Sequence, residues 1–243
     1  MPRSLSRRKF FGKSGRALVA TGAALSGGAF GEAHAKQAPA TKGVNYYTKL
    51  GVTPFINAAG TYTILSASTM PEEVQAAISL ASKYPVQIEE LRDAAGEYLA
   101  RRLRCEAALV TAGAAAALTL GTAACITAGN NQAILSIPTD MTGLKNEVIV
   151  QKAHRYDYDH ALLNCGIRFV EVETLEDYDA AFNERTVMTL FFNAAEHGAI
   201  SREDWVRVAH KHGVPCFNDA AADVPPISNL WNYTEMGFDL VTF

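Results

Sequence analysis

The chain has 243 residues, of which 49% are hydrophobic and 19% charged, and its formal net charge is −3 at pH 7. An acidic balance argues against a nucleic-acid-binding protein, because phosphate recognition needs clustered Lys and Arg side chains. A half-apolar composition over this length can bury a sizeable core, so we expect one main folded domain.

The first 35 residues are arranged like a twin-arginine export signal. The run Ser6–Lys13 contains paired arginines followed by two phenylalanines and a lysine, 17–30 is apolar, and Ala33–Ala35 forms a small-residue cleavage site. We therefore predict cleavage after residue 35 and a periplasmic or extracellular location. We expect no stable membrane anchor, because about 14 weakly apolar residues fall short of the ~20 that a spanning helix needs. A basic tail without a targeting role is the alternative. Cleavage would leave a net charge of about −8.

The remaining chain is predicted to be a linker over 36–50, polar and irregular, and a domain over 51–243. Helical periodicity and capping residues predict helices over 71–83, 88–103, 114–128, 158–165, 175–183 and 201–211. Apolar, β-prone runs predict strands over 107–110, 133–137, 148–151, 167–172, 186–192, 214–217 and 239–243. Strands that alternate with helices predict an α/β fold, with a mostly parallel sheet and helices on both of its faces.

Ligands of such sheets bind at the carboxyl ends of the strands, so the residues after each strand are the candidate site. The first candidate is the small-residue turn that contains Ala112, Gly113, Ala114 and Ala115. Its backbone N–H groups and the start of the following helix could hold a phosphate. An Ala-rich helix that merely packs close to the sheet is the alternative reading.

The second candidate is Asp219, directly after the strand predicted at 214–217. A buried carboxylate there can pair with a protonated pyridine nitrogen, and the small residues Ala220 and Ala221 leave room for a flat ring. A helix cap or a structural role is the alternative.

The third candidate is the polar segment 154–160, after the strand at 148–151. His154 could stack on a pyridine ring and Arg155 could meet an anion, whereas a solvated loop is the alternative. Its Asp and His spacing matches no metal-binding pattern, so we predict no metal site. The four cysteines, Cys105, Cys125, Cys165 and Cys216, are expected to be small core residues, although an oxidising compartment would permit a disulfide.

In their order along the chain, these segments resemble the selenocysteine synthase-like branch of the fold-type I enzymes that use pyridoxal 5′-phosphate (PLP), which includes D-glucosaminate-6-phosphate ammonia lyase. The resemblance runs from about Tyr46 to Phe243 and is carried by the segments 56–61, 106–117, 145–149, 154–161 and 212–226. It implies that residues 112–115 hold the cofactor phosphate, that His154 lies over the ring and that Asp219 meets the ring nitrogen. It also implies that Asn193 reaches the ring hydroxyl.

The resemblance implies a PLP-dependent lyase that eliminates ammonia from an amino acid or amino sugar acid, working as a homodimer or higher homo-oligomer. The family's Schiff-base lysine follows a strand similar to Asp239–Phe243, so it is expected past Phe243, together with a small C-terminal domain. No catalytic residue is therefore predicted within the chain. A non-catalytic exported binding protein or truncated gene product is one alternative, and selenium transfer or other PLP transferase or racemase chemistry is another.

Overall fold

The structure is a computed structural model that describes residues 44–60, 62–193 and 198–243, so the predicted signal peptide lies outside the described residues. The chain divides into two compact units, with the boundary between Ile56 and Asn57. In the first unit, α2 (Tyr46–Leu50) is capped by the Asn45 side chain and ends at Gly51, which is left-handed. The prediction of an irregular linker is therefore wrong for these residues, because a capping Asn and a terminal Gly delimit a short helix.

The second unit is built on a five-stranded sheet in which every neighbouring pair of strands is parallel. The strand order is β2-β1-β3-β4-β5. The strands are β1 (Glu147–Gln151), β2 (Arg168–Val172), β3 (Thr186–Phe192), β4 (Cys216–Asp219) and β5 (Leu240–Thr242). The predicted α/β fold with a mostly parallel sheet is confirmed.

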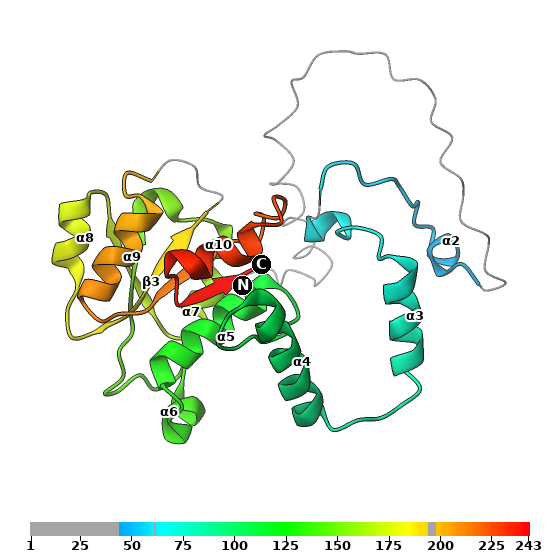
Figure 1. Cartoon of the computed structure of the whole chain (residues 1–243), viewed down its shortest axis with the longest axis horizontal. Coiled ribbons are helices and arrows are strands. Elements are labelled where there is room, and N and C mark those ends of the chain that lie inside the picture. The colour runs from blue at the N-terminus through cyan, green and yellow to red at the C-terminus, as the bar shows by residue number, and fades with distance from the viewer. Residues whose placement is uncertain (1–43, 61, 194–197) are drawn as a thin grey trace, which may run out of the picture. The chain divides into compact units, whose positions relative to one another are not determined.

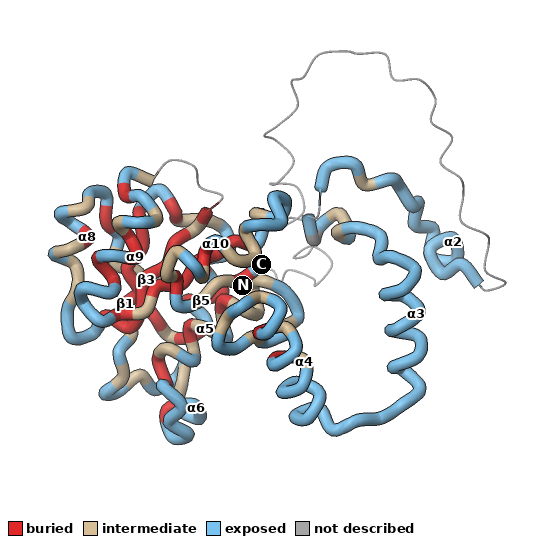
Figure 2. Tube along the Cα trace, in the orientation of Figure 1, coloured by how far each residue is buried: buried red, intermediate tan, exposed pale blue. Residues whose placement is uncertain are grey.

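Alternate residues along the strands divide the core into two clusters, one for each face of the sheet. Ile149, Phe191 and Cys216 belong to one cluster, and their chain neighbours Val148, Leu190 and Phe217 to the other. The first face is covered by α8 (Leu175–Ala181), α9 (Arg202–Lys211) and α10 (Asn229–Met236), and the second by α5 (Ala114–Thr127) and α7 (His160–Leu163) (Figure 1). Figure 2 shows that the buried residues concentrate in the strands between these layers. The central strands are hence apolar on both sides, as parallel sheets require.

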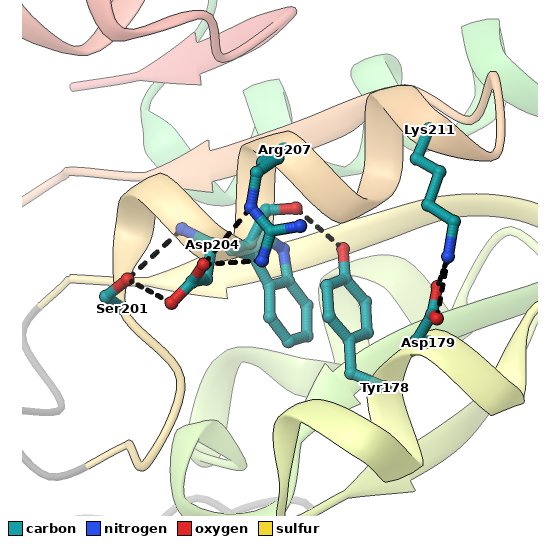
Figure 3. Close-up of polar contacts among 7 residues, drawn as sticks. Tyr178, Asp179, Ser201, Asp204, Arg207 and Lys211 are labelled. Atoms are coloured by element: carbon teal, nitrogen blue, oxygen red, sulfur yellow. Dashed lines mark hydrogen bonds and ion pairs between the residues drawn. The ribbon is translucent and has the colours of Figure 1, made fainter.

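Polar contacts and one aromatic pair fix α9 on its face of the sheet (Figure 3). The Ser201 hydroxyl accepts the N–H of Asp204 at 3.1 Å, which caps the helix as predicted. Tyr178 stacks on Trp205 with ring centroids 3.8 Å apart and donates its hydroxyl to the Trp205 carbonyl at 3.0 Å. At the other end of the helix, Lys211 donates to the Asp179 carboxylate at 2.7 and 2.8 Å.

The segment before α5 is less buried than the sheet region. Its elements are η1 (Thr63–Leu65), α3 (Glu72–Ala81) and α4 (Ile88–Leu103). None of the residues of α3 is buried, whereas α4 buries Gly96 and Ala100 (Figure 2). A Cβ on Gly96 would lie 2.5 Å from the carbonyl oxygen of Ala108, so the missing side chain lets α4 contact the following segment. Shorter elements are η2 (Lys152–His154) and η3 (Asp157–Asp159).

Two predicted strands are absent from the described sheet. Residues 133–137 instead lie in and just after α6 (Asn131–Ser136), because the Asn130 side chain accepts two N–H groups and starts a helix. Residues 107–110 pair with no strand, and Leu109 and Val110 are more than half exposed. Such an apolar run becomes a strand only when a partner satisfies its backbone. The sequence reasoning also missed α10.

The other predicted elements match the described ones to within a few residues at each end. Helix 88–103 and strand 186–192 have the predicted bounds, and the helix predicted over 158–165 is divided into η3 and α7. In the part of the chain with described coordinates, no helix has both the length and the hydropathy needed to cross a membrane.

Candidate functional site

The carboxyl ends of β1, β3 and β4 meet at one edge of the sheet, because all three strands run in the same direction. These ends are Gln151, Phe192 and Asp219, and His154 and Asn193 follow closely in the chain. Asn193 continues the pairing, since its N–H donates to the Asp219 carbonyl at 3.1 Å. The structure thus brings three predicted site residues, His154, Asn193 and Asp219, to one edge.

Asp219 is a buried carboxylate with a defined partner for each oxygen. Oδ1 accepts the N–H of Ala221 at 3.1 Å, and Oδ2 accepts the hydroxyl of Tyr156. The Tyr156 ring stacks on Phe192, with centroids 3.9 Å apart. Burial raises the pKa of Asp219, although the hydrogen bonds from Tyr156 and Ala221 act in the opposite direction. A proton donor on a flat ring could replace the Tyr156 hydroxyl at Oδ2.

His154 is held inside the protein, with 1% of its surface exposed. Its Nδ1 accepts the N–H of Phe192 at 3.3 Å, and its ring packs edge-on against Phe191. Burial and, to a smaller extent, the positive charge of Arg202 lower the pKa of His154 to about 4. The imidazole is therefore neutral near pH 7. The role of His154 over a cofactor ring stays a prediction.

A cavity of about 520 Å³ opens beside these residues and includes His154, Asn193, Arg202 and Tyr233 in its lining. The Asn193 Oδ1 accepts Arg202 Nε at 2.7 Å. The Asn193 Nδ2 is buried and has no hydrogen-bond partner among the residues that the structure describes. A buried donor without a partner is unfavourable, so this amide is available to an acceptor on a ligand.

The small-residue turn lies at the same edge of the sheet, as the direction of α5 shows. The Thr119 hydroxyl donates to Ala161, while Cys165 contacts the backbone of Thr119 and Ala123. Helix α5 therefore runs in the same direction as α7, which leads from the carboxyl end of β1 to the start of β2. The first residue of α5, Ala114, consequently lies towards the carboxyl ends of the strands.

The start of α5 has the features of a helix N-terminus that can bind an anion. Gly113 precedes the helix with φ 139°, and its N–H donates to the Thr111 hydroxyl at 3.3 Å. No side chain of the described residues caps the first turn, which contains no acidic residue, and the helix dipole favours a negative charge. The cavity lining, however, contains neither residues 112–115 nor Asp219. The structure thus shows a shared edge for the predicted residues but no contact between residues 112–115 and the other three.

Tyr156 is the residue of this edge that the sequence reasoning missed. It lies in the polar segment 154–160, and its bond to Asp219 spans 63 positions in the chain. The sequence carried one usable signal, an aromatic residue two positions after His154 at the end of a strand. Such a residue becomes a candidate only once strand order places its segment beside Asp219.

The lysines near the sheet form ion pairs or lie away from the cavity. Lys152 follows β1 at the carboxyl edge, but its ammonium group pairs with Glu173 at 2.6 Å and its side chain is 61% exposed. Lys211 pairs with Asp179 at the far end of α9. Lys145 precedes β1 and thus lies at the opposite edge of the sheet. None of the described lysines lines the cavity.

The residues of this edge fit PLP by their chemistry. An uncapped helix start suits its phosphate, the Asp219 carboxylate suits its ring nitrogen, and the unpartnered Asn193 Nδ2 suits its ring hydroxyl. The neutral, buried His154 adds no competing charge.

No family model matches the chain. It is 31% identical over 211 residues to D-glucosaminate-6-phosphate ammonia lyase of Salmonella typhimurium, an alignment that covers 82% of the chain and 56% of that protein. It is 30% identical over 211 residues to 5'-C-glycyluridine monooxygenase-decarboxylase of a Streptomyces species, covering 81% of the chain and 52% of that protein. The chain therefore spans about half the length of the curated relatives that it matches.

A solved structure of D-glucosaminate-6-phosphate ammonia-lyase superposes on the chain with a TM-score of 0.75 at 32% identity, covering 82% of the chain and 56% of that protein. The parallel sheet has the fold of the fold-type I PLP-dependent enzymes, as the resemblance implied. Within that class, the chain is a homologue of D-glucosaminate-6-phosphate ammonia lyase, as the resemblance in the sequence implied.

Proposed function

We propose that the protein to which this chain belongs is a PLP-dependent lyase that eliminates ammonia from an amino sugar acid or an amino acid. The observation that carries the proposal is the Asp219 carboxylate, which is buried at the carboxyl edge of the sheet and bonded to a replaceable hydroxyl. The homologue that is named as an ammonia lyase supports the reaction class. The name of that homologue makes a phosphorylated amino sugar acid the first substrate to test.

The chain's own residues would divide the work of holding the cofactor. The N–H groups of Ala114 and Ala115 at the start of α5 would bind its phosphate, and Asp219 would hold a proton on its ring nitrogen. Asn193 Nδ2 would donate to the ring hydroxyl. When bound, PLP would withdraw electrons from the carbon that carries the substrate's amine. We propose no covalent anchor among the lysines that the structure describes.

A ring nitrogen that binds Oδ2 of Asp219 would replace the Tyr156 hydroxyl or share this oxygen with it, because that oxygen accepts the hydroxyl. Since the Tyr156 ring stacks on Phe192, a rotation of the phenol could free the carboxylate. Arg202 is held through Asn193, and it supplies a positive charge at the cavity for an acidic group on the substrate.

The test is an ammonia-release assay on the complete protein, with D-glucosaminate 6-phosphate as substrate. The enzyme would be assayed after removal of PLP and again after its return, with Asp219→Ala as the variant. We expect ammonia release that depends on PLP and is lost in the variant. Release of ammonia by the PLP-free protein, or full activity of the variant, would contradict the proposal.

A second reaction class has a specific observation in its favour. The Streptomyces relative is named as a monooxygenase-decarboxylase and matches the chain at 30% identity, close to the value for the ammonia lyase. One fold can support different reactions through a few residues. Measurement of oxygen uptake and carbon dioxide release in the same assay separates the classes, because an ammonia-eliminating lyase consumes no oxygen.

We propose further that the protein is exported by the twin-arginine pathway and acts in the periplasm or outside the cell. The support is the order of paired arginines, apolar stretch and cleavage site within residues 1–35. Fusion of these residues to a reporter tests it: Arg7→Lys together with Arg8→Lys should abolish export. Export that survives in this variant would argue against the pathway.

Assembly as a homodimer or higher homo-oligomer is also proposed. Exposed apolar side chains on α3, namely Val74, Ile78 and Leu80, support it, because a partner surface would cover them. Light scattering on the purified protein would show a multiple of the chain mass, and a monomer at all concentrations would contradict this part of the proposal.

A further inference from the structure

Three side chains that can bind a metal converge at the amino edge of the sheet, opposite to the edge that carries Asp219. His210 lies in the last turn of α9, Cys216 begins β4, and Asp239 directly precedes β5. His210 Nε2 lies 3.1 Å from Asp239 Oδ2 and 3.9 Å from Cys216 Sγ. Cys216 Sγ lies 3.2 Å from the same carboxylate oxygen. One nitrogen, one sulfur and one oxygen thus face one another from three elements.

These separations are close to those around a tetrahedral zinc ion. Zinc bound to sulfur at about 2.3 Å and to nitrogen and oxygen at about 2.1 Å places its ligand atoms roughly 3.4 to 3.6 Å apart. The three measured separations lie within about 0.4 Å of that range. A thiolate, an imidazole and a carboxylate also form the donor set that divalent zinc accepts.

The fold orders the cluster before any ion arrives. The Cys216 N–H donates to Asp239 Oδ2 at 2.8 Å, and the Asp239 N–H donates to the Cys216 carbonyl at 3.0 Å. Cys216 is fully buried, so its sulfur cannot turn away into solvent. The His210 and Asp239 side chains are 46% and 41% exposed, which leaves a path for an ion from solvent. Ordering in the free protein reduces the entropy lost on binding.

Charge also favours a cation here. Across the residues that the structure describes, Asp239 has no ion pair with a lysine or an arginine, and its contact with a basic residue is the one with His210. A thiolate and a carboxylate together would balance the two positive charges of zinc. The alternative is a hydrogen-bonded cluster in which the thiol of Cys216 donates to Asp239 and no ion binds.

We propose that His210, Cys216 and Asp239 form a zinc site, with water as the fourth ligand. The site would join α9 to the starts of β4 and β5, which carry Asp219 and its neighbours at their other ends. Its expected role is to stabilise this part of the sheet. The proposal is independent of the PLP-dependent activity, because the site lies at the opposite edge.

The test uses Co²⁺ as a spectroscopic probe and Zn²⁺ as its competitor. The purified chain is stripped with a chelator, dialysed and titrated with Co²⁺. We expect a thiolate-to-cobalt charge-transfer band that saturates at one equivalent and is displaced by Zn²⁺. Zinc should also raise the melting temperature of the stripped protein, since an ion that binds the folded state stabilises it.

Three variants identify the ligands. Cys216→Ser should remove the charge-transfer band, and the half-exposed His210→Gln, which need not disturb the core, should weaken zinc binding by about tenfold or more. Cys165→Ser is the matched control, because Cys165 is also buried but lies with Thr119 and Ala161 on the other face of the sheet. Circular dichroism would show whether each variant folds; should Cys216→Ser unfold, His210→Gln decides the question. Absence of stoichiometric binding in the folded wild type, a band that persists in folded Cys216→Ser, or unchanged affinity in His210→Gln would overturn the proposal.

Discussion

The Tyr156 hydroxyl donates to the Asp219 carboxylate, and the two residues are 63 positions apart in the chain. The bond joins the segment after β1 to the end of β4, with β3 between these strands in the sheet. The Tyr156 ring also lies on Phe192, the last residue of β3. One side chain therefore connects the carboxyl ends of three strands and covers the oxygen that a cofactor nitrogen would use.

Removal of the Tyr156 hydroxyl should destabilise the chain. Tyr156→Phe leaves Asp219 Oδ2 without its partner while the stacking on Phe192 remains, so we expect a loss of about 1–3 kcal/mol in the free energy of unfolding. Urea denaturation at pH 7 measures it. Tyr158→Phe is the control, because Tyr158 is 49% exposed, and it should change stability by less than about 0.5 kcal/mol. Equal effects of the two variants would contradict this role.

Asp219 should make stability fall as pH rises. Burial raises its pKa in the folded state, so the folded protein holds this proton more tightly than the unfolded chain does. As pH rises from about 3.9, the ordinary carboxyl pKa, to the raised pKa of the folded state, the wild type should therefore lose stability relative to Asp219→Asn. Urea denaturation of both proteins over this range measures the shift. A difference that is constant with pH would contradict it.

His154 should have the opposite effect, making stability fall as pH falls. Its folded-state pKa is lowered to about 4 by burial and by Arg202, whereas an unfolded histidine titrates near 6.5. Stability is therefore complete above the unfolded pKa and declines as pH falls towards 4, by about 3 kcal/mol in all. Denaturation curves of wild type and His154→Gln between pH 7 and 4 isolate this contribution. His160→Gln, at an exposed position, is the control variant.

Gly121 lets α5 approach the sheet. A Cβ at this position would lie 2.4 Å from Phe217 Cε1 and 2.9 Å from its Cζ. Although alanine favours a helix by about 1 kcal/mol over glycine, we expect Gly121→Ala to lower the free energy of unfolding by about 1–3 kcal/mol through overpacking. Thermal or urea unfolding measures the change. A more stable variant would show that α5 can shift outward without loss.

Most of the fold could be predicted from the sequence because its signals are local. Alternating short apolar runs and capped helices predict a parallel α/β sheet, and Ser201 and Asp204 fix the start of α9. The exceptions depend on neighbours or on caps. Residues 107–110 have the composition of a strand but no partner strand in the described sheet, and 133–137 follow the capping residue Asn130 into a helix.

The site could be predicted only in part, for a related reason. Strand ends can be located from the sequence, and in the structure Asp219, Asn193 and His154 lie at one edge of the sheet. Their roles toward a cofactor stay predictions. The pairing of Tyr156 with Asp219 depends on strand order, which the sequence does not state. The same holds for His210, Cys216 and Asp239, whose spacing in the chain matches no metal-binding motif.

Equilibrium dialysis of pyridoxamine 5′-phosphate against this chain tests most directly whether the carboxyl edge is the cofactor site. This compound has the ring and phosphate of PLP but no aldehyde, so binding to exposed lysines does not obscure the result. We predict one bound molecule per chain, with affinity lowered about tenfold or more in Asp219→Ala and unchanged in Asp157→Ala, an exposed carboxylate of the same edge. Absence of binding, or equal affinity in wild type and Asp219→Ala, would contradict the assignment of this edge as the cofactor site.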